Sequence, residues 1–138
     1  MNCVVDASVI IAVIANEPEK EKLIQITKGM ELIAPASIHW EIGNAFSAMI
    51  KRERISLEQA LQALEIYQKI PIRFKEVALS ETLKIAAEHR IYAYDAYLIR
   101  CAQDHQAVLL TLDRKLARMA EEMNVTAIVV SQNEEFEQ

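Results

Sequence analysis

The chain has 138 residues, of which 52% are hydrophobic, and its 15 basic and 20 acidic residues give a formal net charge of −5. This length fits one domain with a core of its own, and a content of two glycines and three prolines excludes a low-complexity or collagen-like chain. Taken alone, the acidic balance argues against a nucleic-acid partner, because phosphate binding usually requires a basic surplus.

Short apolar and β-branched runs alternate with longer stretches of helical spacing along the chain. The expected strands are residues 2–5, 32–34, 72–74, 107–110 and 126–130. The expected helices are residues 7–15, 19–28, 37–52, 57–67, 80–90, 94–105 and 112–123. Ser56 and Gln59 form a capping-box signature before the fourth helix, and Gly29 is typical of the residue that ends the second.

This alternation indicates an α/β fold, a three-layer sandwich in which a mostly parallel central sheet of about five short strands is flanked by helices. We expect residues 1–130 to form a single domain and the polar, acidic residues 131–138 to form a C-terminal tail. No stretch has the roughly 20 apolar residues of a membrane-spanning helix, and the N-terminus lacks the basic region of a secretory signal. Cys3 and Cys101 are isolated cysteines, which is typical of a protein in a reducing cytoplasm.

Four acidic residues stand at unusual places, each just after a strand or early in a helix. Asp6 and Asp113 follow expected strands, whereas Glu41 and Asp95 lie near the starts of expected helices among apolar neighbours. Because strand ends and the helix starts that follow them lie at one edge of a parallel sheet, these side chains can converge there. Carboxylates in one cleft raise each other's pKa values, and a divalent cation such as Mg²⁺ or Mn²⁺ removes that cost.

Each acid also has a purely structural interpretation. Asp6 and Asp113 could cap the helices that follow them, and Asp95 could complement a helix dipole. Glu41 is harder to explain in this way, because the positions one turn before and after it offer no basic partner. Clustered acids with perturbed pKa values are typical of functional sites, and we therefore favour a shared site.

Four short segments follow one another along the chain: V-V-D-A-S-V at 4–9, E-I-G-N at 41–44, Y-D-A-Y at 94–97 and T-L-D at 111–113. In this order and spacing they resemble the motifs of PIN-domain ribonucleases, and among these the VapC-type toxins of toxin–antitoxin pairs. The resemblance covers about residues 2–130. On this sequence it assigns the family's acidic positions to Asp6, Glu41, Asp95 and Asp113, and the accompanying polar positions to Ser8, Asn44 and Thr111.

The resemblance implies a PIN-like fold and a metal-dependent endoribonuclease that hydrolyses RNA phosphodiester bonds, leaving a 5′-phosphate and a 3′-hydroxyl. One Mg²⁺ or Mn²⁺ ion would be held chiefly by Asp6, Asp95 and Asp113 and would activate a water molecule. A second ion, shared with Glu41, would steady the leaving oxygen. The three polar residues would orient water and ligands. A cognate antitoxin and a homodimer are implied in the same way.

An RNA substrate would also need basic side chains near the acids. Several basic residues lie on the helices that carry or follow the four acids, and they could contact phosphates, with a merely solvated helix face as the alternative for each. They are Lys51, Arg52, Arg100, Arg114, Lys115 and Arg118. Subtracting the four acids and the three glutamates of the tail from 20 leaves 13 acidic residues against 15 basic ones, so the net charge no longer argues against RNA.

Apolar residues at helical spacing over 38–50 and 57–67 predict a helical hairpin. The resemblance implies that such a hairpin forms a groove for an antitoxin segment, with Trp40, Phe46 and Met49 as candidate contacts and core packing as the alternative for each. The residues leave two further functions open. One is a non-catalytic PIN-like scaffold that binds RNA or protein, and the other is a metal-dependent phosphohydrolase acting on another phosphate ester.

Overall fold

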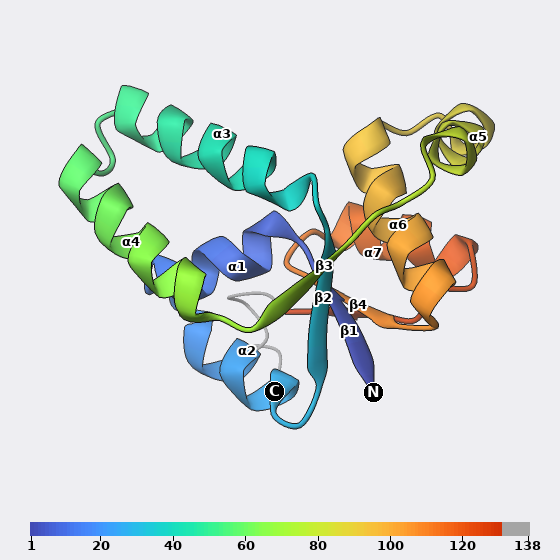
Figure 1. The fold of residues 1–138 in the computed structure, drawn as a ribbon, viewed down its shortest axis with the longest axis horizontal. Coiled ribbons are helices and arrows are strands. Elements are labelled where there is room, and N and C mark those ends of the chain that lie inside the picture. The colour runs from blue at the N-terminus through green and yellow to red at the C-terminus, as the bar shows by residue number, and fades with distance from the viewer. Residues whose placement is uncertain (131–138) are drawn as a thin grey trace.

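The computed structural model describes residues 1–130, which form a five-stranded parallel sheet with helices on both faces (Figure 1). The strands are β1 (Asn2–Val5), β2 (Glu31–Pro35), β3 (Ile72–Lys75), β4 (Val108–Thr111) and β5 (Ala127–Val129). The helices are α1 (Ala7–Ile14), α2 (Lys20–Thr27), α3 (Ile38–Lys51), α4 (Leu57–Lys69), α5 (Leu79–His89), α6 (Ala93–His105) and α7 (Arg114–Glu122). The predicted three-layer α/β fold is confirmed, with every expected strand and helix present to within about two residues at each end. The predicted tail, residues 131–138, lies outside the described residues.

The strands lie in the order β3-β2-β1-β4-β5, and each neighbouring pair is parallel. From β1 the chain extends the sheet in one direction through β2 and β3, and it then returns to the other side of β1 with β4 and β5. The direction of winding therefore reverses between β1 and β4. In open parallel sheets such a reversal leaves a crevice beyond the carboxyl ends of the strands, where ligands bind.

The reversal also divides the helices between the two faces of the sheet, because crossovers between parallel strands are right-handed. On one face, α1 contacts α2, α3 and α4; on the other, α6 packs across β1, β2 and β4 beside α5, while α7 packs on β4 and β5 (Figure 1). The hairpin of α3 and α4 runs away from the sheet, and the loop that joins the two helices lies far from the strands (Figure 1). The starts of α3 and α6 lie on opposite sides of the carboxyl edge.

The central strands consist of nearly continuous apolar residues because both faces of the sheet are buried. Val4, Ile33 and Leu109 are each at most 1% exposed, because helices cover both faces of the sheet. On α3 the buried residues include Ile38 and Ile42, one turn apart on the side that faces the core. Within residues 1–130, every helix is too short or too polar to cross a lipid bilayer.

Local signals fix two of the helix ends. At the start of α4, the Gln59 amide donates to Ser56 Oγ at 3.1 Å, and the Ser56 amide donates to Gln59 Oε1 at 2.9 Å, which confirms the capping box. After α2, Gly29 takes a φ of +77°, the left-handed conformation that glycine adopts without strain.

Candidate functional site

The four predicted acids lie at the carboxyl edge of the sheet, where the winding reverses. Asp6 directly follows β1, and Asp113 follows β4 with one residue between. Glu41 lies in the first turn of α3, and Asp95 lies in the first turn of α6. Segments that are distant in the sequence therefore bring four carboxyl groups to one end of the sheet.

Asp6 is the most buried of the four acids, at 5% exposed. Its Oδ1 accepts hydrogen bonds from Ser8 Oγ at 2.6 Å and from the Val9 amide at 3.0 Å, and its Oδ2 accepts one from Thr111 Oγ1 at 2.5 Å. Burial raises the pKa of this carboxyl, the three hydrogen bonds lower it, and the charge of Asp113 raises it. All three donors are neutral, so the buried charge is oriented by them but is not neutralised.

Glu41 shows the electrostatic contact between the acids most clearly. Burial raises the pKa of Glu41 to about 7, and the charges of Asp6 and Asp95 raise it as well, against a lowering hydrogen bond from Ser37. That bond runs from Ser37 Oγ to Glu41 Oε2 at 3.5 Å. The charges of Asp6 and Asp95 therefore reach Glu41, and a cation placed near these carboxyl groups would relieve the repulsion.

Asp95 completes the group from the α6 side. Burial and the charge of Asp113 raise the pKa of Asp95, whereas the charge of Lys115 lowers it. Each of the four acids is therefore coupled through its charge to at least one of the others. Lys115 is therefore a basic residue whose charge acts on this group.

Two of the acids also cap helices. Asp113 Oδ1 accepts hydrogen bonds from the amides of Lys115 at 2.9 Å and Leu116 at 3.2 Å, at the start of α7. Asp6 caps α1 through the bond from the Val9 amide. The capping interpretation of these two residues is therefore confirmed, and it does not compete with a shared site, since capping directs each carboxylate to the same edge of the sheet.

Polar neighbours hold the acids in place. The Thr111 hydroxyl, which donates to Asp6, accepts a hydrogen bond from the Asp113 amide at 2.9 Å. Ser8 Oγ likewise donates to Asp6 and accepts from the Leu112 amide at 3.3 Å. These bonds tie the end of β1 to the end of β4. Asn44 lies almost one turn after Glu41 on α3 and is exposed, and its assignment to the site stays a prediction.

The chemistry of this group suits a hard divalent cation. Its oxygens come from carboxylates, the ligands that Mg²⁺ and Mn²⁺ prefer. The raised pKa values of Asp6, Glu41 and Asp95 reflect burial and a repulsion that a bound cation would relieve. Within residues 1–130, no three acidic, histidine or cysteine side chains stand close enough together to form a ready-made metal site. The four acids therefore fit a divalent metal by their chemistry and charge, with side chains that would have to draw together around it.

The predicted RNA-contacting residues fall into three groups. Arg114, Lys115 and Arg118 are exposed on α7, which begins at Asp113. Lys51 and Arg52 are exposed at the far end of α3, about 15 Å along the helix from Glu41 at about 1.5 Å per residue.

The third group is a single arginine on α6 that already has acidic partners. Arg100 Nε lies 2.8 Å from Asp104 Oδ1, and its Nη1 lies 3.9 Å from Glu81 Oε2. These ion pairs hold the guanidinium between α5 and α6. Arg100 is therefore the weakest candidate for a phosphate contact.

The predicted antitoxin contacts are placed differently from one another. Trp40 is 73% exposed, Met49 is half-buried, and Phe46 is only 4% exposed within the core. Phe46 follows Ile38 and Ile42 at four-residue spacing, so it belongs to the buried side of α3. The structure thus assigns Phe46 to the core and leaves Trp40 as the accessible member of the three.

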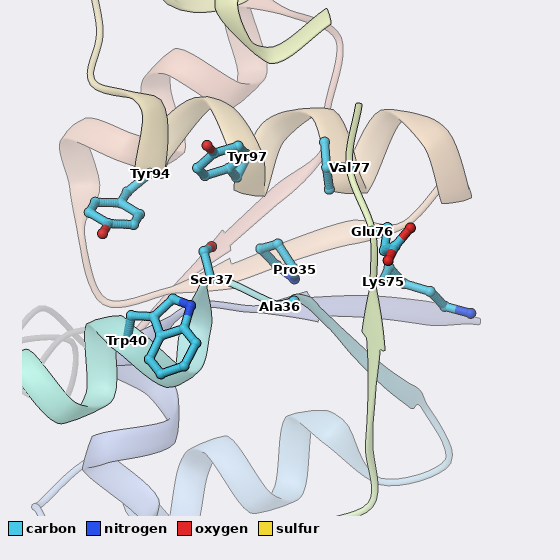
Figure 2. A pocket seen from close by; sticks show the side chains of 9 residues that line it. All are labelled: Pro35, Ala36, Ser37, Trp40, Lys75, Glu76, Val77, Tyr94 and Tyr97. Carbon is cyan, nitrogen blue, oxygen red and sulfur yellow. The ribbon is translucent and has the colours of Figure 1, made fainter. Parts of the chain in front are cut away.

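A pocket beside the acids was not predicted from the sequence. It has a volume of about 430 Å³ and lies between the start of α3 and the start of α6, above the ends of β2 and β3 (Figure 2). Trp40 lies on one side of it, and Tyr94 and Tyr97 lie on the other. The signal that could have revealed it is the pair of tyrosines on either side of Asp95, together with a tryptophan directly before Glu41.

Comparisons with known proteins agree with this architecture. The family model of the PIN domain matches residues 3–122. Ribonuclease VapC3 of Pyrobaculum aerophilum is 27% identical over 122 residues, which make up 85% of this chain and 93% of that protein.

Two solved structures extend the likeness to three dimensions. The crystal structure of PAE2754 from Pyrobaculum aerophilum has a TM-score of 0.70 at 24% identity and covers 92% of each chain. The crystal structure of VapBC2 from Rickettsia felis, bound to a DNA fragment from its promoter, has a TM-score of 0.66 at 16% identity and covers 94% of this chain and 98% of that one. At these identities the two structures show a common fold.

Proposed function

The chain belongs to the PIN domain family, and from this premise we propose that it is a metal-dependent endoribonuclease, the toxin of a VapBC-type toxin–antitoxin pair. The observation that carries the proposal is the coupled group of four carboxyl residues around the buried Asp6. A protein named as a ribonuclease aligns with 85% of this chain, and this likeness supports RNA as the proposed substrate.

In this proposal, Asp6, Glu41, Asp95 and Asp113 hold one or two Mg²⁺ or Mn²⁺ ions. A divalent ion supplies Lewis-acid chemistry, in which it acidifies an attacking water and stabilises charge on the phosphate oxygens. In this proposal the protein directs the four side chains to one edge of the sheet, and the cation stabilises their charged forms. The raised pKa of Glu41, about 7, means that cation binding has to displace a proton from this side chain at neutral pH.

The hydroxyl groups of Ser8 and Thr111 act through Asp6. Each donates one hydrogen bond to a different carboxylate oxygen, so the plane and the charge of this carboxylate are fixed before any ligand arrives. We place Asn44 in the site as an amide that orients water or substrate from α3.

The substrate has to be held as well as cleaved. Lys115, whose charge acts on Asp95, is the best-supported phosphate contact, and Arg114 and Arg118 extend the basic surface along α7. Lys51 and Arg52 would contact a more distant part of an RNA, since they lie near the far end of the hairpin.

The proposed partners are a cognate antitoxin and a second copy of the chain. A solved structure of VapBC2 with this fold supports the antitoxin, and the exposed Trp40 at the start of the hairpin is its candidate contact here. Both cysteines are buried and free, which supports action in a reducing cytoplasm.

The direct test is cleavage of a labelled single-stranded RNA by the purified chain with Mg²⁺ or Mn²⁺, compared with the same reaction in EDTA. We expect metal-dependent products with 5′-phosphate and 3′-hydroxyl ends. Parallel reactions with single-stranded DNA and with small phosphate esters separate RNA cleavage from a general phosphohydrolase. Tight RNA binding with no cleavage under any divalent metal would contradict the proposal and would indicate a binding scaffold.

A further inference from the structure

We propose that the aromatic pocket between α3 and α6 binds one unpaired nucleobase of the RNA, next to the phosphodiester bond that is cleaved. This inference rests on the proposed ribonuclease function and adds a substrate-binding site that selects unpaired bases. The residues assigned to the site are Trp40, Tyr94 and Tyr97 (Figure 2).

The first argument is the position of the pocket. Ser37 lines it and also donates a hydrogen bond to Glu41 Oε2. On the other side, Tyr94 and Tyr97 line it from the same first turns of α6 that carry Asp95. The pocket therefore shares its two helix starts with Glu41 and Asp95, so a nucleotide bound there would lie at the same edge of the sheet as the acids.

The second argument is the chemistry of the walls. Trp40 is 73% exposed and Tyr94 is 49% exposed, although aromatic side chains gain most by burial. The rings of Tyr94 and Tyr97 have centroids 6.2 Å apart and an interplanar angle of 60°, so neither ring covers the face of the other. Open aromatic faces of this kind are the surfaces on which single-stranded bases stack in a sequence-tolerant way.

The third argument is the size of the pocket. The pocket volume of about 430 Å³ falls in the usual range for small-ligand pockets. An antitoxin helix would instead need an extended groove. Lys75 and Glu76 line the pocket from the end of β3 and carry opposite charges, so the aromatic walls, not a net charge, would hold the base. The Ala36 amide donates to the Lys75 carbonyl at 3.2 Å, so the ends of β2 and β3 form a fixed floor.

The base has to be unpaired and unstacked before it can enter. Bases inside a duplex present only their edges, whereas single-stranded loops can turn a base out onto an aromatic side chain. The pocket would therefore select an RNA loop or a single strand over a duplex. It would act on substrate binding, since none of its residues is proposed to touch the reacting phosphate.

A direct test uses the fact that Trp40 is the only tryptophan in the chain. The Asp6→Asn chain, or the wild-type chain in EDTA, is titrated with a ten-nucleotide unstructured RNA while tryptophan fluorescence is recorded. We expect saturable quenching, and much weaker quenching by the same oligomer with abasic central nucleotides. Equal quenching by the abasic oligomer, or no change with RNA at all, overturns the proposal.

Variants test the same site through cleavage. Removing one stacking aromatic should lower kcat/KM for a single-stranded RNA by roughly 5- to 150-fold, mostly through KM, in Trp40→Ala and in Tyr94→Ala. Trp40→Phe should restore most of the loss. Tyr92→Ala is the matched control, because Tyr92 is 86% exposed just before α6 and does not line the pocket.

The two hypotheses fail in different ways. A wild-type chain that cleaves no RNA contradicts the ribonuclease, and the fluorescence titration then still decides whether the pocket binds a base. Active Trp40→Ala and Tyr94→Ala chains with wild-type kcat/KM leave the ribonuclease intact and overturn the base pocket. Fluorescence quenching by an antitoxin peptide and not by RNA would assign the pocket to a protein partner. That result would also overturn the proposal that the pocket binds a base.

Discussion

Thr111 donates a hydrogen bond of 2.5 Å from its hydroxyl to Oδ2 of Asp6, joining the ends of β4 and β1 across 105 residues of sequence. The same hydroxyl accepts a bond from the Asp113 amide, so one neutral side chain positions two of the four acids. Both partners of the Thr111–Asp6 bond are buried. A buried acceptor that loses its donor keeps its desolvation cost, which makes this bond a sensitive point of the site.

Replacing Thr111 with Val removes that hydroxyl and keeps a side chain of similar shape. We expect kcat/KM for RNA to fall about 10- to 100-fold, as for other residues that orient a metal ligand. Because the hydrogen bond from Thr111 lowers the pKa of Asp6, its loss should raise that pKa and move the acid limb of the pH–rate profile to higher pH.

Thr126→Val is the control, because Thr126 is exposed and lies away from the acids, just before β5. The measurements are kcat/KM across the pH range and the free energy of unfolding, which should fall by about 1–3 kcal/mol in Thr111→Val. An unchanged pH profile in Thr111→Val would show that the hydroxyl has no part in positioning Asp6.

Asp6→Asn and Asp95→Asn should each abolish RNA cleavage while the chain still folds. Losing a metal ligand should lower kcat/KM more than losing a residue that only orients a ligand. We therefore expect kcat/KM to fall by more than about 100-fold. Stability without metal should not fall in Asp95→Asn, since it removes a carboxyl whose pKa burial has raised. In Asp6→Asn the same gain is offset by one lost acceptor, because Asp6 accepts hydrogen bonds at both carboxylate oxygens.

Asp104→Asn provides the matched control on α6, because it loses only its ion pair with Arg100, worth about 0–1 kcal/mol at most. Cleavage assays and thermal unfolding of the three variants check this prediction. Full activity in Asp6→Asn or Asp95→Asn would remove that residue from the site.

Much of the fold could be predicted because its signals are local. Strands buried on both faces need continuous apolar residues, and helix ends need particular residues such as Ser56 with Gln59, or Gly29. The order β3-β2-β1-β4-β5 could not be predicted, since it depends on packing between segments far apart in the sequence. No local sequence pattern predicts which strand lies next to β1 in the sheet.

The candidate site also has features that the sequence predicts and features that depend on the fold. A carboxylate just after a strand or early in a helix is visible in a sequence, and the structure brings all four such residues to one edge. The pocket is made by two helix starts that only the fold brings together. Helical geometry could nevertheless have separated Trp40 from Phe46: Trp40 lies about 200° around α3 from Ile38, on the exposed side, whereas Phe46 continues the buried stripe.

Ser56→Ala should destabilise the protein without touching the site. It removes the hydroxyl that accepts from the Gln59 amide at the start of α4, at a cost of about 0.5–2 kcal/mol in the free energy of unfolding. Urea unfolding measures the loss, and kcat/KM for RNA should stay at the wild-type value. Ser80→Ala is the control, because Ser80 is exposed on α5 and caps no helix; a loss as large as that of Ser56→Ala would contradict the capping argument.

The pH dependence of stability should report on Glu41. Its folded-state pKa of about 7 lies above the ordinary glutamate value of 4.5, so between these values the folded chain binds more protons than the unfolded one. Without divalent metal, the contribution of Glu41 to stability should therefore decline as pH rises from about 4.5 to about 7, and stay constant above. Asp6 and Asp95, whose pKa values are also raised, add slopes of the same sign.

Glu41→Gln should flatten this dependence in part, because the amide does not titrate while Asp6 and Asp95 still do. Mg²⁺ should reverse the loss at pH 8 and have little effect at pH 5, where protons compete for the same oxygens. At 100 times its dissociation constant, a bound ion adds about 2.7 kcal/mol to the free energy of unfolding, which thermal unfolding resolves easily. If the wild-type chain and Glu41→Gln keep the same slope between pH 5 and 8, Glu41 is not one of the coupled acids, whatever its place in the fold.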